Sequence, residues 1–285
     1  MLMTANLNRV LVTHAKDAFV SQHQLGKNWQ KFGYKVEPDF KEACKESDQF
    51  IASLELAGIR VDVLPAELCT GMDALYTHDP AELLPDGFLI GSMGKPERQN
   101  EPAALEKWLI AEGRPIVGRI SGAGKLEGGD VVWLTETLVA IGVGYRTNVD
   151  GVSQFASFAP SGTEVLSVHL PHWNGPSDVL HLMSMVSPLD KKEFLVYSRT
   201  MPAAFRMRML AEGLRLIEVP DEEYNTMGCN VLSLGNKQVM VEKKNTKTRS
   251  TLESHGYTVI PYSGTHISHP GEGGPTCLTR PLERS

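Results

Sequence analysis

The chain has 285 residues, of which 41% are hydrophobic and 22% are charged, and its formal net charge is −6. These values are typical of a globular protein, and the length allows one large domain or two ordinary ones. The acidic balance argues against nucleic-acid binding, and no apolar run approaches the roughly 20 residues of a membrane span.

Short apolar strands are predicted along the whole chain, with amphipathic helices between them. The expected strands cover residues 9–13, 60–64, 87–90, 131–134, 138–142, 164–170, 194–196, 215–219, 230–234, 238–241 and 258–261. The expected helices cover residues 38–57, 101–111, 149–158, 203–212 and 245–255. Strands that alternate with helices favour an α/β architecture.

Five positions in this pattern recur at nearly even spacing. Asp79, Asp130, His181, Asn230 and Cys277 are separated by 51, 51, 49 and 47 residues. A period near 50 residues is typical of a propeller or an array of repeated units. If five units close around an axis, these five residues, called the marked positions below, meet at its centre. The alternative is coincidence, because strands are frequent in any α/β protein.

The cysteines indicate the redox environment. Cys44, Cys69, Cys229 and Cys277 are widely and irregularly spaced, which argues against a disulfide framework and a structural zinc site. The first residues show no basic segment followed by an apolar stretch and a cleavage site. We therefore expect a cytoplasmic protein with reduced thiols.

Cys277 is the candidate nucleophile. It follows Gly273, Gly274 and Pro275, and glycines permit backbone geometry that an ordinary strand does not need. A thiolate is a strong nucleophile, but it needs neighbouring groups that favour ionisation. The alternative is that Cys277 is a small buried apolar side chain.

One histidine and several acids are candidate partners for the thiol. His181 lies in an apolar run and has a pKa suited to proton transfer, although it could instead be a core residue. Glu127 and Asp130 flank two glycines before an apolar strand, where a turn or a cap is the alternative. Asp73 and Asp79 occupy a similar setting, and Asp79 could simply initiate a turn before proline.

A thiolate, an imidazole and several carboxylates together favour a cationic electrophile. Carboxylates would repel a developing oxyanion, whereas the planar N–H fork of a guanidinium matches them. The predicted reaction is attack of Cys277 on the central guanidinium carbon. His181 would protonate the leaving nitrogen and then activate water. No metal and no organic cofactor is expected, because side chains supply every role.

Four segments, residues 126–130, 144–148, 180–182 and 273–277, resemble the guanidino-modifying superfamily in order and spacing. This superfamily includes dimethylarginine dimethylaminohydrolases, arginine deiminases and amidinotransferases. The resemblance implies the pentein fold, a five-bladed α/β propeller of ββαβ-like repeats around a pseudo-fivefold axis. It implies a single catalytic domain over residues 1–285.

The resemblance also implies residue roles. Cys277 would form a covalent amidino-thiol intermediate, and His181 would act as general acid and base. Glu127 would hold the guanidinium and orient the site. Asp79 falls on a second guanidinium-binding acid, and Asp73 on a further acid of the substrate pocket.

Two arginines match positions that grip a substrate carboxylate: Arg146 falls on one such arginine, and Arg98 on the second. Asp130 is expected among the substrate-binding residues. His78 stands where similar dimethylaminohydrolases carry glutamate, so it is expected to affect which nitrogen substituents fit. Met183 replaces an aspartate of arginine deiminases, which argues against a standard deiminase.

The leading hypothesis is a cysteine hydrolase that cleaves a guanidine C–N bond of arginine or an N-substituted, for example methylated, arginine. The products would be citrulline and an amine or ammonia. The alternatives are an amidinotransferase, an arginine deiminase or dihydrolase, a citrulline hydrolase, and a non-catalytic ligand-binding propeller. The expected partner is a small guanidino compound, without nucleic acid or membrane, and a homodimer is left open.

Overall fold

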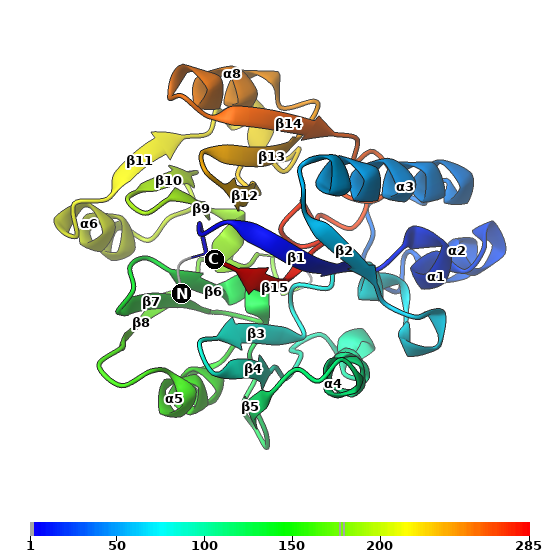
Figure 1. Cartoon of the computed structure of the whole chain (residues 1–285), viewed down its shortest axis with the longest axis horizontal. Coiled ribbons are helices and arrows are strands. Elements are labelled where there is room, and N and C mark those ends of the chain that lie inside the picture. Colours follow the sequence, from blue (N-terminus) through cyan, green and yellow to red (C-terminus); the bar gives the residue numbers. More distant parts are fainter. Residues whose placement is uncertain (1–2, 177, 179) are drawn as a thin grey trace.

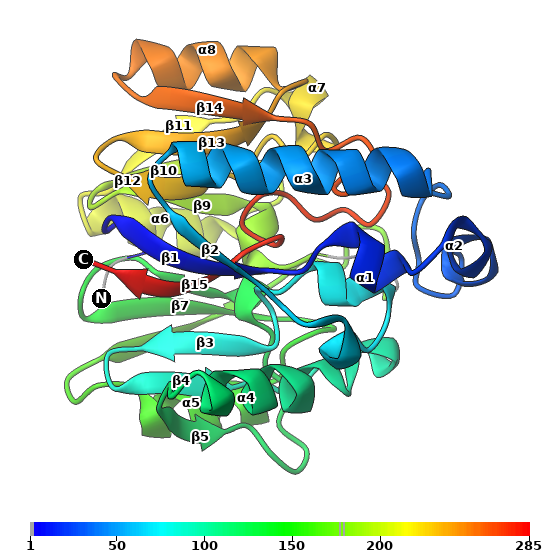
Figure 2. The same cartoon turned by 45° about the vertical axis from the view of Figure 1, so that its right-hand side comes forward.

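Figures 1 and 2 show a computed structural model of the chain, which describes residues 3–176, 178 and 180–285. Within these ranges, the strands form five three-stranded sheets. The second sheet shows the repeating pattern. Strand β3 (Ala81–Leu84) pairs antiparallel with β4 (Gly87–Ile90), and β5 (Ile116–Arg119) returns parallel to β4 after helix α4 (Glu101–Ala111).

The next three units repeat this ββαβ order. The third unit has β6 (Val131–Trp133), β7 (Leu138–Val143), α5 (Val149–Phe158) and β8 (Glu164–His169). The fourth has β9 (Val186–Asp190), β10 (Glu193–Val196), α6 (Ala203–Ala211) and β11 (Arg215–Glu218). The fifth has α7 (Asp221–Tyr224) before β12 (Leu232–Gly235), then β13 (Gln238–Glu242), α8 (Thr246–Ser254) and β14 (Thr258–Tyr262).

The first unit joins the two ends of the described chain. Strand β1 (Leu7–Val12) lies between β15 (Arg280–Arg284), to which it is antiparallel, and β2 (Arg60–Val63), to which it is parallel. Three helices lie between β1 and β2: α1 (Ala15–Phe19), α2 (Gln22–Asn28) and α3 (Phe40–Leu56). Pairing of β15 with β1 completes the fifth sheet and closes the ring.

The five units surround a common axis. The first strands of neighbouring units contact one another, β6 with β9, β9 with β12 and β15 with β3. The long helices lie outside the sheets, at the edge of the molecule (Figure 1). Five ββαβ units around one axis confirm the five-bladed α/β propeller predicted from the sequence.

The apolar pattern explains the central strands. In β7, residues Val139, Ala140 and Ile141 have no exposed surface, because this strand is covered by its neighbours on both sides. Continuous apolar runs are typical of strands buried in this way. The predicted helices over residues 101–111 and 149–158 are confirmed with the same bounds.

The sequence does not predict β3, β5, β9 or β15. Two of them contain proline, Pro188 in β9 and Pro281 in β15, and two contain buried charges, Glu82 and Arg280. Each first strand has one hydrogen-bonded neighbour in its sheet, so a missing N–H is tolerated. Arg280 Nη1 lies 3.0 Å from Glu82 Oε2, and this ion pair joins β15 to β3. Arg280 and Glu82 therefore pair with each other only when the ring is closed.

Each marked position lies just before the first strand of a unit. Asp79 precedes β3, Asp130 precedes β6, His181 precedes β9, Asn230 precedes β12 and Cys277 precedes β15. The regular spacing therefore reflects the repeat rather than coincidence. None of the helices within the described residues combines the length and apolar character that a membrane span needs.

The loop before Cys277 is anchored by a buried acid of α3. Glu46 accepts hydrogen bonds from Ser263 Oγ at 2.6 Å and from the backbone N–H groups of Thr265, His266 and Ile267 at 3.0, 2.7 and 3.2 Å. A single carboxylate thus satisfies several loop donors at once. It holds the start of the segment that leads to the candidate nucleophile.

We predict that Glu46→Ala lowers the free energy of unfolding by about 2–4 kcal/mol, because it leaves buried N–H donors without an acceptor. Urea denaturation measures this change. The matched control is Glu55→Ala, an exposed acid of the same helix, which should change stability by about 0.5 kcal/mol or less. Equal stability of the two variants would show that the anchor is unimportant.

Candidate active site

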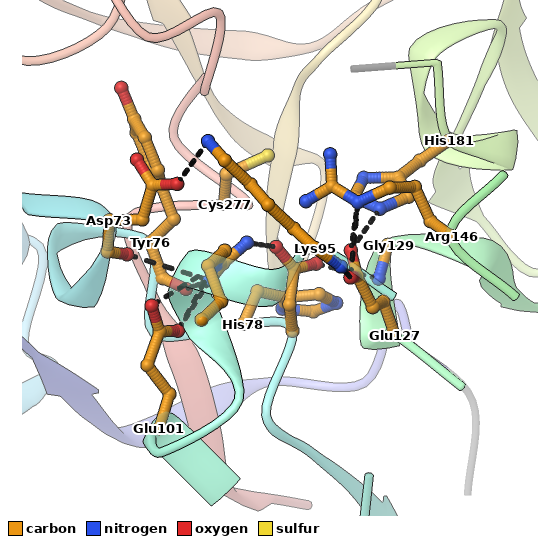
Figure 3. Close-up of polar contacts among 12 residues, drawn as sticks. Asp73, Tyr76, His78, Lys95, Glu101, Glu127, Gly129, Arg146, His181 and Cys277 are labelled. Carbon is orange, nitrogen blue, oxygen red and sulfur yellow. Dashed lines mark hydrogen bonds and ion pairs between the residues drawn. The ribbon is translucent and has the colours of Figure 1, made fainter. Parts of the chain in front are cut away.

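A cleft lies where the marked positions meet. Asp79, His181, Asn230 and Cys277 line it, and each comes from a different unit. Figure 3 shows the side chains around this cleft. The fold thus brings the predicted thiol, the predicted imidazole and a predicted acid into one cleft.

Cys277 is held by Asn230. The Asn230 amide Nδ2 donates to Cys277 Sγ at 3.1 Å, and its Oδ1 accepts from the Thr276 N–H at 3.1 Å. Gly274 makes this contact possible, since a Cβ there would lie 2.5 Å from the Asn230 side chain. A residue without a side chain is therefore required at position 274, so that the Asn230 side chain can lie close to this backbone. The 50-residue spacing marked Asn230, but its role beside the thiol is visible only in the structure.

The thiol of Cys277 is neutral at rest. Burial, followed by the negative charge of Asp79, raises its pKa to about 12. The Asn230 hydrogen bond favours the thiolate but does not outweigh burial. A nucleophile in this state needs a nearby positive charge to ionise near neutral pH.

Glu127 and His181 form a buried pair. His181 Nε2 lies 2.7 Å from Glu127 Oε2, and Glu127 has no exposed surface. Burial would raise the pKa of Glu127, but Arg146 and His181 outweigh it and hold that pKa well below its usual value. Burial lowers the pKa of His181, yet the nearby acids, with Asp79 foremost, raise it above its ordinary value. An ionised carboxylate thus fixes the imidazole and favours its protonated form.

The two glycines after Glu127 allow His78, Asp79 and His181 to pack closely against this segment. A Cβ at Gly129 would lie 2.6 Å from His181 Nδ1, and one at Gly128 would lie 2.5 Å from the carbonyl oxygen of His78. The Gly129 N–H also donates to Asp79 Oδ1 at 2.9 Å. The motif of residues 126–130 is therefore a close-packed junction between three units.

Asp130 does not line the cleft. It is fully buried, and its Oδ1 accepts from the Leu182 N–H at 2.9 Å. Burial raises its pKa to about 6. This placement argues against the expected substrate-binding role of Asp130, because its contact fixes the backbone beside His181.

Arg98 also differs from expectation. Its Nη1 bonds to Asp79 Oδ2 at 2.5 Å, its Nε to both Glu101 oxygens at 3.0 Å, and its Nη2 to Glu101 Oε2 at 2.7 Å. The Nη2 group also donates to the Tyr76 carbonyl at 3.0 Å, and the side chain is 2% exposed. Arg98 lines the cleft, but every guanidinium nitrogen is paired inside the protein. These pairs hold Asp79 and argue against the expected role of Arg98 as a carboxylate ligand.

Arg146 is placed as the sequence predicts. It lines the cleft, and its Nε contacts Glu127 Oε1 at 3.1 Å. Its terminal nitrogens extend past Glu127 in Figure 3, and they have no hydrogen-bond partner that the described residues supply. These N–H groups can therefore bind an anion without losing a protein contact.

His78 does not line the cleft. It is 1% exposed, and its Nδ1–H donates to the Thr279 carbonyl at 3.0 Å. Asp79 and His78 lie in one turn but line different cavities. Burial lowers the pKa of His78 to about 3, so it is neutral. This placement argues against the expected contact between His78 and the substrate.

Asp73 lines the cleft, but it already has a cationic partner. Lys95 Nζ lies 2.6 Å from Asp73 Oδ2 and also donates to the Phe32 carbonyl at 2.5 Å. Sequence reasoning missed Lys95, although it lies in the same segment as Arg98. No local pattern indicates this contact, because Asp73, Lys95 and Phe32 belong to separate segments.

One group of ligating atoms could hold a cation. Single side-chain atoms of Asp79, Glu127 and His181 lie within 4.8 Å of one another. Both carboxylates already pair with guanidinium groups, those of Arg98 and Arg146. Two adjacent guanidinium cations would repel a divalent ion, so the trio fits proton transfer better than a resident metal.

We predict slow alkylation of Cys277 near pH 7, because its buried thiol is neutral there. The rate should rise about tenfold per pH unit through pH 9, as the thiolate fraction rises. Iodoacetamide labelling followed by mass spectrometry of each cysteine measures this rate, with Cys44, which lies outside the cleft, as the internal control. A rate that levels off below pH 8 would contradict the raised pKa.

A second prediction tests the assignment of Arg98. Arg98→Met should lower the free energy of unfolding by about 3–5 kcal/mol, since it leaves Asp79 and Glu101 buried without their cation. Chemical denaturation measures the loss. Exposed Arg60→Met is the control. If Arg98→Met had normal stability and only a raised KM for a carboxylate substrate, Arg98 would be a carboxylate ligand, as expected from the sequence.

Comparison with known proteins gives relatives that match most of the chain. An arginine deiminase of Limosilactobacillus fermentum is 23% identical over 256 residues, which cover 74% of this chain and 61% of that enzyme. The uncharacterised protein YkgA of Bacillus subtilis is 28% identical over 247 residues, which cover 86% of this chain and 81% of YkgA.

Solved structures share the fold. Dimethylarginine dimethylaminohydrolase from Pseudomonas aeruginosa, a mutant complexed with citrulline, is 19% identical with a TM-score of 0.76, covering 96% of this chain and 99% of that one. The N-terminal domain of the cyanobacterial arginine dihydrolase ArgZ is 20% identical with a TM-score of 0.80, covering 98% of each chain. SxtG, an amidinotransferase of Microseira wollei, is 17% identical with a TM-score of 0.79, covering 99% and 96%.

A family model described as N,N dimethylarginine dimethylhydrolase, eukaryotic, matches residues 17–284. This match covers nearly the whole chain, including Glu127, His181 and Cys277. The chain therefore belongs to this family and is a hydrolase of the class that acts on C–N bonds of linear amidines.

Proposed function

We propose that the protein hydrolyses a guanidine C–N bond through a covalent intermediate on Cys277. One observation carries this proposal: the Glu127–His181 pair and the thiol converge on a single cleft that also holds Asp79. Cys277 supplies a nucleophile, His181 a proton donor and Asp79 a carboxylate that can bind a cation.

Binding of the substrate activates the thiol. A guanidinium beside Asp79 brings a positive charge to the cleft and lowers the free energy of the thiolate relative to the neutral thiol. This matters because burial otherwise holds the pKa of Cys277 near 12. The enzyme thereby forms its reactive thiolate when a cationic substrate is present.

The covalent step follows from the positions of the two groups. The Cys277 thiol loses its proton to solvent, and the thiolate Sγ attacks the central guanidinium carbon. The bond to one nitrogen breaks, and protonated His181 donates a proton to the departing amine. Neutral His181 then removes a proton from water. The water oxygen bonds to the same carbon, the carbon–sulfur bond breaks, and the product is a urea group.

Glu127 acts through His181. Its Oε2 holds the imidazole, and its Oε1 accepts from the Gly94 N–H at 2.9 Å. Because Glu127 has no exposed surface, we assign it the orientation of His181, while Asp79 contacts the guanidinium. Arg146 binds the carboxylate at the other end of the substrate.

Arginine and N-substituted arginines are the first candidate substrates, with citrulline and an amine or ammonia as products. The family match and the likeness to a dimethylaminohydrolase and an arginine dihydrolase support this choice. The likeness to an amidinotransferase makes transfer to an amine the alternative outcome. We further propose that residues 1–285 act as one catalytic domain; the cytoplasmic location and the homodimer stay predictions.

Incubation in ¹⁸O-labelled water tests the proposal. Guanidino compounds, including arginine, methylated arginines and guanidino acids, should give a ureido product that carries one ¹⁸O atom, as measured by mass spectrometry. Cys277→Ser should reduce product formation by at least about a thousandfold, because a hydroxyl is a far weaker nucleophile here.

Cys44→Ser is the matched control, since Cys44 lies outside the cleft and should leave the rate unchanged. A product formed without ¹⁸O, but only when an amine acceptor is added, would favour an amidinotransferase. Equal activity of Cys277→Ser and the parent protein would exclude the covalent mechanism.

A further inference from the structure

Lys95 lies in the cleft at a position that suits a cation. Its Nζ contacts a carboxylate, Asp73 Oδ2, at 2.6 Å and a carbonyl, that of Phe32, at 2.5 Å. The same Nζ lies 5.6 Å from the centre of the Phe32 ring. A carboxylate, a carbonyl oxygen and an aromatic face together form a typical binding site for an ammonium ion.

The protein fills this site with its own ammonium group. Asp73 is 3% exposed and the Lys95 side chain is 17% exposed, so the pair lies in the wall of the cleft rather than at the surface. Figure 3 shows the Lys95 side chain crossing the site from the Glu127 side to Asp73. The charge of Asp73 is therefore balanced by Lys95 before any substrate arrives.

The backbone at Lys95 is fixed, which limits how far the side chain can withdraw. The N–H groups of Gly94 and Lys95 point to Glu127 Oε1 at 2.9 and 3.4 Å. A Cβ at Gly94 would lie 2.5 Å from the carbonyl oxygen of Arg146, so this turn packs closely against the Arg146 backbone. The lysine is thus anchored to the same carboxylate that holds His181.

A second ammonium cannot share the site favourably. A substrate ammonium bound to the free oxygen of Asp73 would lie beside Lys95 Nζ in a poorly hydrated wall, where like charges repel strongly. It would also lose the Phe32 carbonyl, which Lys95 already uses. A carboxylate has the opposite preference, because Arg146 and Lys95 both present N–H donors to this cleft.

We propose that Lys95 selects guanidino carboxylates that lack an α-ammonium group over α-amino acids such as arginine. This inference rests on the proposed hydrolase function and narrows its substrate class. The guanidinium lies beside Asp79 and Cys277, and the substrate carboxylate lies beside Arg146. Lys95 takes the place that the α-ammonium of arginine would need.

Matched substrates test this selection, because 5-guanidinopentanoate is arginine without its α-amino group. The parent protein should show kcat/KM for 5-guanidinopentanoate about tenfold or more above that for arginine, with 4-guanidinobutanoate tested as the shorter acid. Ureido product is the measured quantity. A preference for arginine over both acids would overturn the proposal.

Lys95→Met should abolish the preference, since it frees Asp73 and the Phe32 carbonyl for a substrate ammonium. The ratio of kcat/KM for 5-guanidinopentanoate to that for arginine should fall by about tenfold or more. The exposed Lys107→Met on α4 should leave the ratio unchanged. An unchanged ratio in a folded Lys95→Met protein, checked by its thermal unfolding, would show that Lys95 does not select the substrate.

Binding separates this inference from the hydrolase proposal. Calorimetric titration of Cys277→Ser with 5-guanidinopentanoate and with arginine requires no turnover. Tighter binding of the des-amino acid, lost in the Cys277→Ser/Lys95→Met double variant, supports the selection even if no ureido product forms with any compound. Equal or weaker binding of the des-amino acid overturns it even if the protein proves to be a hydrolase.

Discussion

The buried carboxylate of Glu127 is the interaction on which the site depends. It is wholly enclosed, and it binds His181 through one oxygen and the Gly94 N–H through the other, with Arg146 alongside. A buried charge is stable only when partners surround it. Because these partners come from several units, the ring must close before the proton donor, the anion ligand and the turn that carries Lys95 take their places.

The cleft balances its other charges in the same way. Asp79 pairs with Arg98, which is shared with Glu101, and Asp73 pairs with Lys95. These pairs leave a pocket whose acids keep their positions without a ligand. The cost is a neutral thiol, because burial and the nearby acid disfavour the thiolate of Cys277. In the proposed mechanism, a substrate that brings its own positive charge removes that obstacle, and recognition of the substrate is thereby linked to activation of Cys277.

The sequence predicted the repeat because every unit needs the same junction. A polar or small residue before the first strand of each unit marks the point where the chain reaches the axis, so the spacing of Asp79, Asp130, His181, Asn230 and Cys277 was visible without coordinates. The strands β3, β9 and β15 were not visible. Their prolines and charges resemble surface residues, and they become buried and paired only against other units.

The sequence by itself determined the α/β class, the five units and the set of residues from which a thiol, an imidazole and an acid could be chosen. Only the tertiary structure decided which way each side chain points. It turned His78 and Asp130 away from the cleft, enclosed Arg98 between acids, and placed Lys95 on Asp73. The physical reason is that periodicity along the chain fixes where an element lies. The partner of a buried charge is set instead by residues that are distant in sequence and adjacent only after folding.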